Sequence, residues 1–181
     1  RNDNNHRIRY KWRRTVTDIK DVLVSSAELY GERPFLLYKP SGVEPFKPIT
    51  YSELLRDVNS LGTAMINRGL KGKHIGVVGQ NAYEWYESYL AITAGTGVAI
   101  PLDKELSEDE LKQLAIMGDI DAIITMPKYY DKIKNIKDSG DTQIEYIIDV
   151  GHEEHEIGEG TLSWHKLMEE GSNLILEGDS S

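Results

Sequence analysis

Apolar positions along the chain follow two alternating patterns. Where apolar residues recur every three or four positions, helices are predicted, over residues 15–31, 50–69, 82–95, 107–118, 127–140 and 162–171. Short runs rich in Val, Ile and Leu predict strands over residues 34–39, 48–50, 74–79, 97–103, 121–125 and 144–150. Because strand and helix alternate with short connections, we expect an α/β fold, a parallel and partly mixed sheet with helices on both faces and right-handed crossovers.

Polar residues and glycines mark the expected helix ends. An N-cap side chain and a glutamate three residues later together satisfy backbone N–H groups that a first helical turn leaves unpaired. Such pairs are Thr50 with Glu53, Asn81 with Glu84, and Ser107 with Glu110. Pro127 stands where a first turn accepts proline, and glycines that end helices stand at positions 31, 69, 95, 118 and 140.

The same spacing identifies the side chains expected to face the core. They are Ile19, Val22, Leu23, Ala27 and Tyr30; Tyr51, Leu54, Leu55, Val58, Leu61 and Met65; Trp85, Tyr89 and Leu90; Leu111, Leu114 and Ala115; and Tyr130, Ile133 and Ile136. We divide the chain into a basic N-terminal arm (1–14), an entry helix and hairpin-like segment (15–48), an α/β subdomain (49–150), and an acidic loop with a short helix (151–181).

Charge is unevenly distributed over these parts. The first 14 residues have a net charge of +5, because they contain six of the 21 Lys and Arg and one Asp. The whole chain has a net charge of −9, so residues 15–181 carry −14. A body this acidic repels polyanions such as ATP, coenzyme A and nucleic acid over most of its surface. A site for a polyanion must therefore be built locally or lie outside this chain.

Composition narrows the class of protein further. With 39% hydrophobic and 28% charged residues, the chain matches folded soluble proteins. The absence of cysteine excludes disulfides, thiolate nucleophiles and zinc–cysteine sites. No apolar run approaches the roughly 20 residues that span a bilayer, and the N-terminus does not resemble a signal peptide, so we expect a cytoplasmic protein.

Two glycine-containing turns are candidates for a phosphate-binding loop. Such a loop lies between a strand and the N-terminus of a helix, whose unpaired N–H groups face the anion. Gly95 and Gly97 follow a helix instead, so we interpret them as a helix end with tight helix–strand packing. "GVVGQNAYEW" (residues 76–85) has the correct order but lacks further glycines and a nearby lysine, which favours an ordinary turn.

Two charged segments suggest other chemistry. His152 and His155 in "HEEHE" are three residues apart in a glycine-flanked loop, which favours a solvated acidic loop over a metal site. The arm "RIRYKWRR" interleaves basic residues with aromatic ones: Arg7, Arg9, Lys11, Arg13 and Arg14 with Tyr10 and Trp12. A peripheral arm with solvated cations is the favoured interpretation; no nucleic-acid partner is expected, and contact with an anionic membrane stays open.

Residues 49–103 resemble the N-terminal region of the AMP-forming acyl-CoA synthetases, which are adenylate-forming enzymes. The likeness lies in "ITYSEL" (49–54), "NAYEW" (81–85), and "AITAGTGVAIPL" (91–102), in the family's order and spacing. "SEDELKQLAIMGDIDAIIT" (107–125) resembles the helix and strand that follow, so the similarity covers most of residues 15–150. Glu84–Trp85 and the late "SWHKLMEEG" (163–171) resemble the long-chain fatty-acid branch.

The resemblance implies that the parent enzyme activates a carboxylic acid with ATP and Mg²⁺ and transfers the acyl group to coenzyme A. The family's "TSGTTGxPKG"-type phosphate loop, its adenine and ribose contacts and its C-terminal lysine are missing from this sequence. We therefore expect an inactive N-terminal fragment that packs against the rest of its own chain, with no catalytic, cofactor-binding or metal-binding residue and no tight binding of a cofactor. The oligomeric state is left open. The alternatives are a stand-alone α/β binding or regulatory module, or an enzyme that adenylates an amino or aryl acid.

Overall fold

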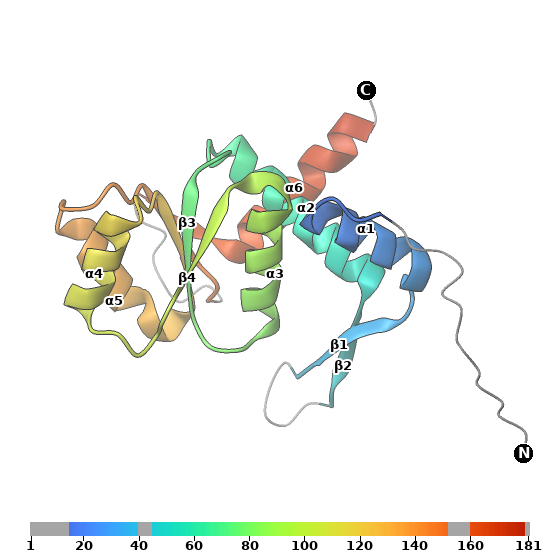
Figure 1. Cartoon of the computed structure of the whole chain (residues 1–181), viewed down its shortest axis with the longest axis horizontal. Coiled ribbons are helices and arrows are strands. Elements are labelled where there is room, and N and C mark those ends of the chain that lie inside the picture. Colours follow the sequence, from blue (N-terminus) through green and yellow to red (C-terminus); the bar gives the residue numbers. More distant parts are fainter. Residues whose placement is uncertain (1–14, 40–44, 152–159, 180–181) are drawn as a thin grey trace, which may run out of the picture.

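The structure, a computed structural model, describes residues 15–39, 45–151 and 160–179 (Figure 1). Its centre is a parallel sheet with strand order β4-β3-β5-β6-β7. The strands are β3 (His74–Val78), β4 (Val98–Leu102), β5 (Ala122–Thr125), β6 (Tyr146–Asp149) and β7 (Thr161–Ser163). A separate antiparallel pair consists of β1 (Pro34–Tyr38) and β2 (Lys47–Thr50). The predicted α/β fold is confirmed.

Helices cover both faces of the sheet, as Figure 1 shows. One face carries α2 (Tyr51–Asn67), α3 (Tyr83–Ala91) and α6 (Trp164–Asp179), and the other carries α4 (Glu108–Met117) and α5 (Tyr130–Asp138). α1 (Ile19–Tyr30) packs on α2. In β5 successive side chains point to opposite faces, so Ala122 and Ile124 join the cluster around α2 while Ile123 joins the cluster under α4 and α5.

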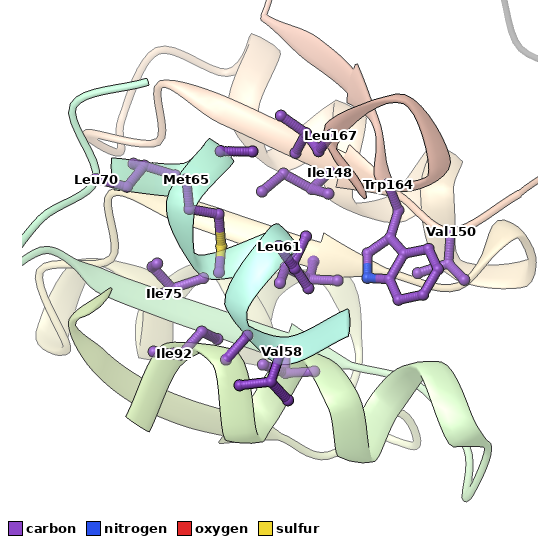
Figure 2. Close-up of a cluster of buried hydrophobic side chains, with 14 of the residues drawn as sticks. Val58, Leu61, Met65, Leu70, Ile75, Ile92, Ile148, Val150, Trp164 and Leu167 are labelled. Atoms are coloured by element: carbon purple, nitrogen blue, oxygen red, sulfur yellow. The ribbon is translucent and has the colours of Figure 1, made fainter. Parts of the chain in front are cut away.

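The larger core cluster is centred on α2. Figure 2 shows Leu61 and Met65 between the sheet residues Ile75 and Ile148 and the residues Trp164 and Leu167 of α6. Leu61 and Met65 are fully buried. At the end of this contact the Arg68 guanidinium forms a salt bridge to Glu170, with 2.6 Å between Nη2 and Oε2. α2 and α6 therefore form one packed unit, although about a hundred residues of chain separate them.

Two of the three predicted capping boxes are confirmed, and the third is wrong. The Thr50 N–H donates to Glu53 Oε2 at 2.8 Å while the Glu53 N–H donates to Thr50 Oγ1 at 3.1 Å, and Ser107 with Glu110 forms the same reciprocal pair. α3 instead begins after Ala82, which makes no side-chain cap, so Asn81 and Glu84 do not form a box. The carboxylate of Glu84 accepts a hydrogen bond from the Tyr38 hydroxyl at 3.2 Å, which draws it towards the hairpin.

The predicted buried faces are correct for α2 and α5 but need correction elsewhere. In α3, Trp85 and Leu90 are only partly buried but pack against the core, and Tyr89 is also partly buried. The buried side chains are Tyr83, Glu87, Ser88 and Ala91. The Trp85 ring stacks on that of Tyr89 with 5.5 Å between centroids, an arrangement that satisfies large aromatic rings at the edge of the core. Leu114 of α4 is 39% exposed, and in α1 only Leu23 is buried.

The end of the described chain also differs from the prediction. β7 was not predicted, and the last helix extends to Asp179 instead of ending at Gly171. Gly171 lies inside α6 at the point where the backbone of α2 comes close. A Cβ atom at this position would overlap the carbonyl of Ser60, so the close approach requires a glycine. A glycine required for close helix packing thus has the same sequence signature as a glycine that ends a helix.

Candidate functional site: the carboxyl edge of the sheet

Gly95 and Gly97 close α3, as predicted. The helix ends in a π-type turn over Ile92–Thr96, in which Gly95 has φ of 139°, and the Gly97 N–H donates to the Ile92 carbonyl at 2.9 Å. The ammonium group of Lys71 donates to the Gly95 carbonyl. The turn thus lies at the carbonyl end of a helix, where the negative partial charge disfavours a phosphate.

Gly97 serves close packing of the backbone. A Cβ atom at Gly97 would collide with the Lys73 carbonyl, because the turn that precedes β3 lies directly against the start of β4. The Val98 N–H donates to this same Lys73 carbonyl at 2.9 Å. The interpretation of the Gly-x-Gly pair as tight helix–strand packing is thus confirmed.

The turn after β3 borders an open hollow of about 490 Å³ at the carboxyl ends of β3 and β4. Its lining consists of Gly79, Gln80, Asn81, Leu102, Asp103 and Lys104. Parallel α/β sheets bind ligands outside the carboxyl ends of their strands, where successive connections depart to opposite faces. Here that point lies between β3, which leads into α3, and β5, which leads towards α5 on the other face.

A side chain fills the position where a ligand would enter between β3 and β5. A Cβ atom at Gly79 would lie 2.6 Å from Met126 Cγ, so the methionine packs directly on the glycine backbone. The Met126 N–H also donates to the Val78 carbonyl at 3.3 Å, which continues the pairing of β3 and β5 into the turn. What remains open is the flank over β4, where Asp103 and Lys104 supply one negative and one positive charge.

A second polar cluster is buried between α2 and α3. Glu87 is 0% exposed, and neither of its carboxyl oxygens makes a hydrogen bond to another described residue. Burial, followed by the negative charge of Asp57, raises the pKa of Glu87 to about 9; the nearby Tyr83 hydroxyl acts in the opposite direction. Burial, followed by the charges of Glu87 and Asp57, raises the pKa of Tyr83, whose hydroxyl donates to Asp57 Oδ2 at 3.3 Å. At neutral pH, Glu87 is therefore an uncharged acid.

Sequence reasoning missed Glu87 because the predicted inward residues Trp85 and Leu90 pack at the margin of the core, beside the more deeply buried face that carries Glu87. One signal was present: Glu87 lies one turn after Tyr83 and one turn before Ala91, and these three side chains share the buried face. On that face the Ser88 hydroxyl accepts a hydrogen bond from the Trp164 indole N–H at 2.9 Å, which ties α3 to the start of α6.

No group of three or more His, Asp or Glu side chains within residues 15–39, 45–151 and 160–179 is arranged to hold a metal ion. His152 and His155 lie outside the described residues, as do the basic residues of the arm. Among the described helices none is long and apolar enough to cross a membrane. The expectation that this chain contributes no catalytic or cofactor-binding residue stays a prediction.

The sheet, its two helical layers and the turns at its carboxyl edge define an α/β subdomain built on a five-stranded parallel sheet. The model of the AMP-binding enzyme family matches residues 23–171, and the chain belongs to this family. No sequence among curated proteins matches significantly.

Solved structures with the same fold include a long-chain-fatty-acid–CoA ligase from Archaeoglobus fulgidus (TM-score 0.74, 18% identity, 88% of this chain and 31% of that one). An anthranilate CoA ligase in complex with anthranoyl-AMP has a TM-score of 0.70 at 18% identity, over 84% of this chain and 27% of that one. An acetoacetyl-CoA synthetase from Streptomyces lividans has a TM-score of 0.70 at 19% identity, over 83% and 25%. The chain spans about a quarter to a third of the length of these proteins.

Proposed function

We propose that this chain is the N-terminal subdomain of an ATP-dependent acyl-CoA ligase. The match of the AMP-binding enzyme family over residues 23–171 carries the proposal. In the proposed reaction a substrate carboxylate attacks the α-phosphate of ATP, and pyrophosphate leaves as the acyl adenylate forms. The thiol of coenzyme A then attacks the acyl carbonyl, AMP leaves, and a thioester results.

The proposed role of this chain in that reaction is structural. The hollow at the carboxyl edge has a single lysine, Lys104, whose ammonium group lies 3.8 Å from Glu105. An open site with one partly neutralised cation is poorly suited to a triphosphate, which proteins bind with several convergent N–H groups and cations. We assign ATP, coenzyme A and Mg²⁺, which would neutralise the phosphates, to the remaining parts of the ligase, against which this sheet layer packs.

Our proposed substrate is a long-chain fatty acid. The "NAYEW" and "SWHKLMEEG" segments support it, and one solved structure of the same fold is a long-chain-fatty-acid–CoA ligase. An aryl acid is the second candidate, because another structure of this fold is an anthranilate CoA ligase. A cytoplasmic location and the division at residues 14, 48 and 150 belong to the same proposal, and contact of the arm with an anionic membrane stays open.

The decisive measurement is ATP–pyrophosphate exchange with a panel of long-chain fatty, aryl and amino acids. The 181-residue chain should give no exchange above background, whereas a polypeptide that continues into the remaining parts of the ligase should give exchange with long-chain fatty acids. Exchange by the 181-residue chain alone would contradict the structural role. Exchange by the longer chain only with aryl acids would replace the proposed substrate.

A further inference from the structure

α1 carries exposed apolar side chains beside its buried position. Leu23 faces the core, but Ile19 and Val22, one turn apart, are 40% and 45% exposed, and Leu29 near the end of the helix is 54% exposed. Positions 19, 22 and 29 fall on one side of a helix with 3.6 residues per turn, next to Leu23, and Ser25 and Ser26 interrupt this side. No element of the described chain covers these three apolar side chains fully.

The hairpin of β1 and β2 also has exposed apolar side chains. Leu36 and Tyr38 point towards the core and pack against it, whereas Phe35 and Leu37 point the opposite way. Leu37 is 62% exposed, as is Phe46 beside the start of β2. In the described residues this sheet consists of two strands only, and an isolated two-stranded hairpin is marginal in water unless another element packs on it.

Aromatic contacts join these two surfaces. The ring of Tyr51, at the start of α2, lies 5.8 Å from that of Tyr30 and 5.5 Å from that of Phe35, centroid to centroid. The exposed apolar side chains of α1 are therefore connected through Tyr30 and Tyr51 to the outer face of the hairpin. α1 and the hairpin lie together at the end of the molecule away from α4 and α5 (Figure 1). We call this surface, Ile19, Val22, Leu29, Tyr30, Phe35, Leu37 and Phe46, the entry face.

We propose that the entry face is an intramolecular interface, covered by an apolar surface of the remaining part of the same ligase. The inference rests on the proposed function. The solved structures that match this chain over 83–88% of its length are about three times as long, so most of such a ligase is additional polypeptide. An exposed apolar face of this kind on a soluble protein marks a protein contact, and a covalently linked partner is always present at high effective concentration.

The absence of cysteine from this chain makes the proposal directly testable. We would introduce a single thiol by Val22→Cys or Leu37→Cys, in the 181-residue chain and in the longer ligase, and follow maleimide labelling by peptide mass mapping. Gln113→Cys on the exposed side of α4 is the matched control, and circular dichroism checks that each variant folds. In the longer ligase we expect labelling at positions 22 and 37 to slow at least about tenfold, with position 113 unchanged.

Equal labelling of positions 22 and 37 in both chain lengths would overturn the proposal. Slowing in the 181-residue chain as its concentration rises would identify a second copy as the occupant, and protection only by added anionic vesicles would identify a membrane; either also overturns it. If the longer chain catalyses pyrophosphate exchange but positions 22 and 37 are not protected, the interface is rejected and the proposed function stands. If these positions are protected but the longer chain catalyses no exchange, the interface stands and the proposed function is rejected.

Discussion

At the scale of single residues, Glu87 is the most unusual group in the described chain. Its carboxyl group is fully buried, without a hydrogen bond to another described residue, on a helix face shared with Tyr83, Ser88 and Ala91. A buried carboxylate is costly, so the site keeps the proton. The folded protein therefore binds one more proton than the unfolded chain between the usual pKa of 4.5 and the raised pKa of about 9.

This difference in proton binding predicts a pH dependence of stability. Since the folded state binds the extra proton, the free energy of unfolding should fall as pH rises from 5 to 9, by up to about 1.4 kcal/mol per pH unit. The Glu87→Gln variant, which cannot ionise, should show a flatter profile, with stability near that of the wild type at pH 5 and higher at pH 8.

Urea unfolding of both proteins across this range measures the effect. The exposed carboxyl groups whose pKa values are lowered, such as Asp141 beside Lys112, titrate below this window and affect both proteins equally. Parallel profiles for the wild type and the Glu87→Gln variant would show that Glu87 is ionised in the folded state.

At the scale of elements, the contact between α2 and α6 depends on one glycine. Because a Cβ atom at Gly171 would overlap the Ser60 carbonyl, the Gly171→Ala variant must displace α6 from α2. We expect a loss of about 1–3 kcal/mol in the free energy of unfolding, the usual cost of overpacking. Gly178→Ala in the same helix is the matched control, since a Cβ atom there meets nothing within 4 Å.

Chemical unfolding of the two variants separates packing from helix propensity. Alanine favours a helix over glycine by up to about 1 kcal/mol, so the Gly178→Ala variant should be as stable as the wild type or slightly more so. Equal stability of the Gly171→Ala variant and the wild type would refute the close approach of α2 and α6.

The elements differ in how far the sequence could predict them. The capping boxes at Thr50 and Ser107 are local, because both partners lie within one helical turn, and both were predicted. β7 has only three residues, which is too short for a local periodicity, and it pairs with a strand more than ten residues earlier in the sequence. The predicted helix end at residue 171 is wrong because the close packing of Gly171 depends on a backbone over a hundred positions away. Local patterns predicted the starts of α2 and α4, whereas tertiary contacts decided the exceptions.

At the scale of the whole molecule, the charge distribution argues against tight binding of phosphates by this chain alone. The net charge of −9 includes the basic arm, and residues 15–181 together carry −14. The two glycine turns have other local contacts: the Gly95 carbonyl accepts a hydrogen bond from Lys71, and Gly79 packs on Met126. The fold class could be read from the order of strands and helices, but the hollow could not, because it joins residues from two separate turns.

We therefore expect no stabilisation of the 181-residue chain by nucleotides. Thermal unfolding with millimolar ATP and Mg²⁺, AMP or coenzyme A should give the same midpoint as without ligand, since a ligand stabilises only the state that binds it. Inorganic sulfate at equal ionic strength controls for general salt effects. A concentration-dependent rise specific to one nucleotide would reveal a binding site within this chain.

The salt bridge between Arg68 and Glu170 joins two helices that the ribosome synthesises at different times. During synthesis α2 leaves the ribosome about a hundred residues before its partner α6, so the face with Leu61 and Met65 stays uncovered while most of the sheet is already synthesised. A nascent chain interrupted before Trp164 would contain all the described strands yet expose the side of α2 that forms the core. We expect synthesis of α6 to be the step that covers this apolar face.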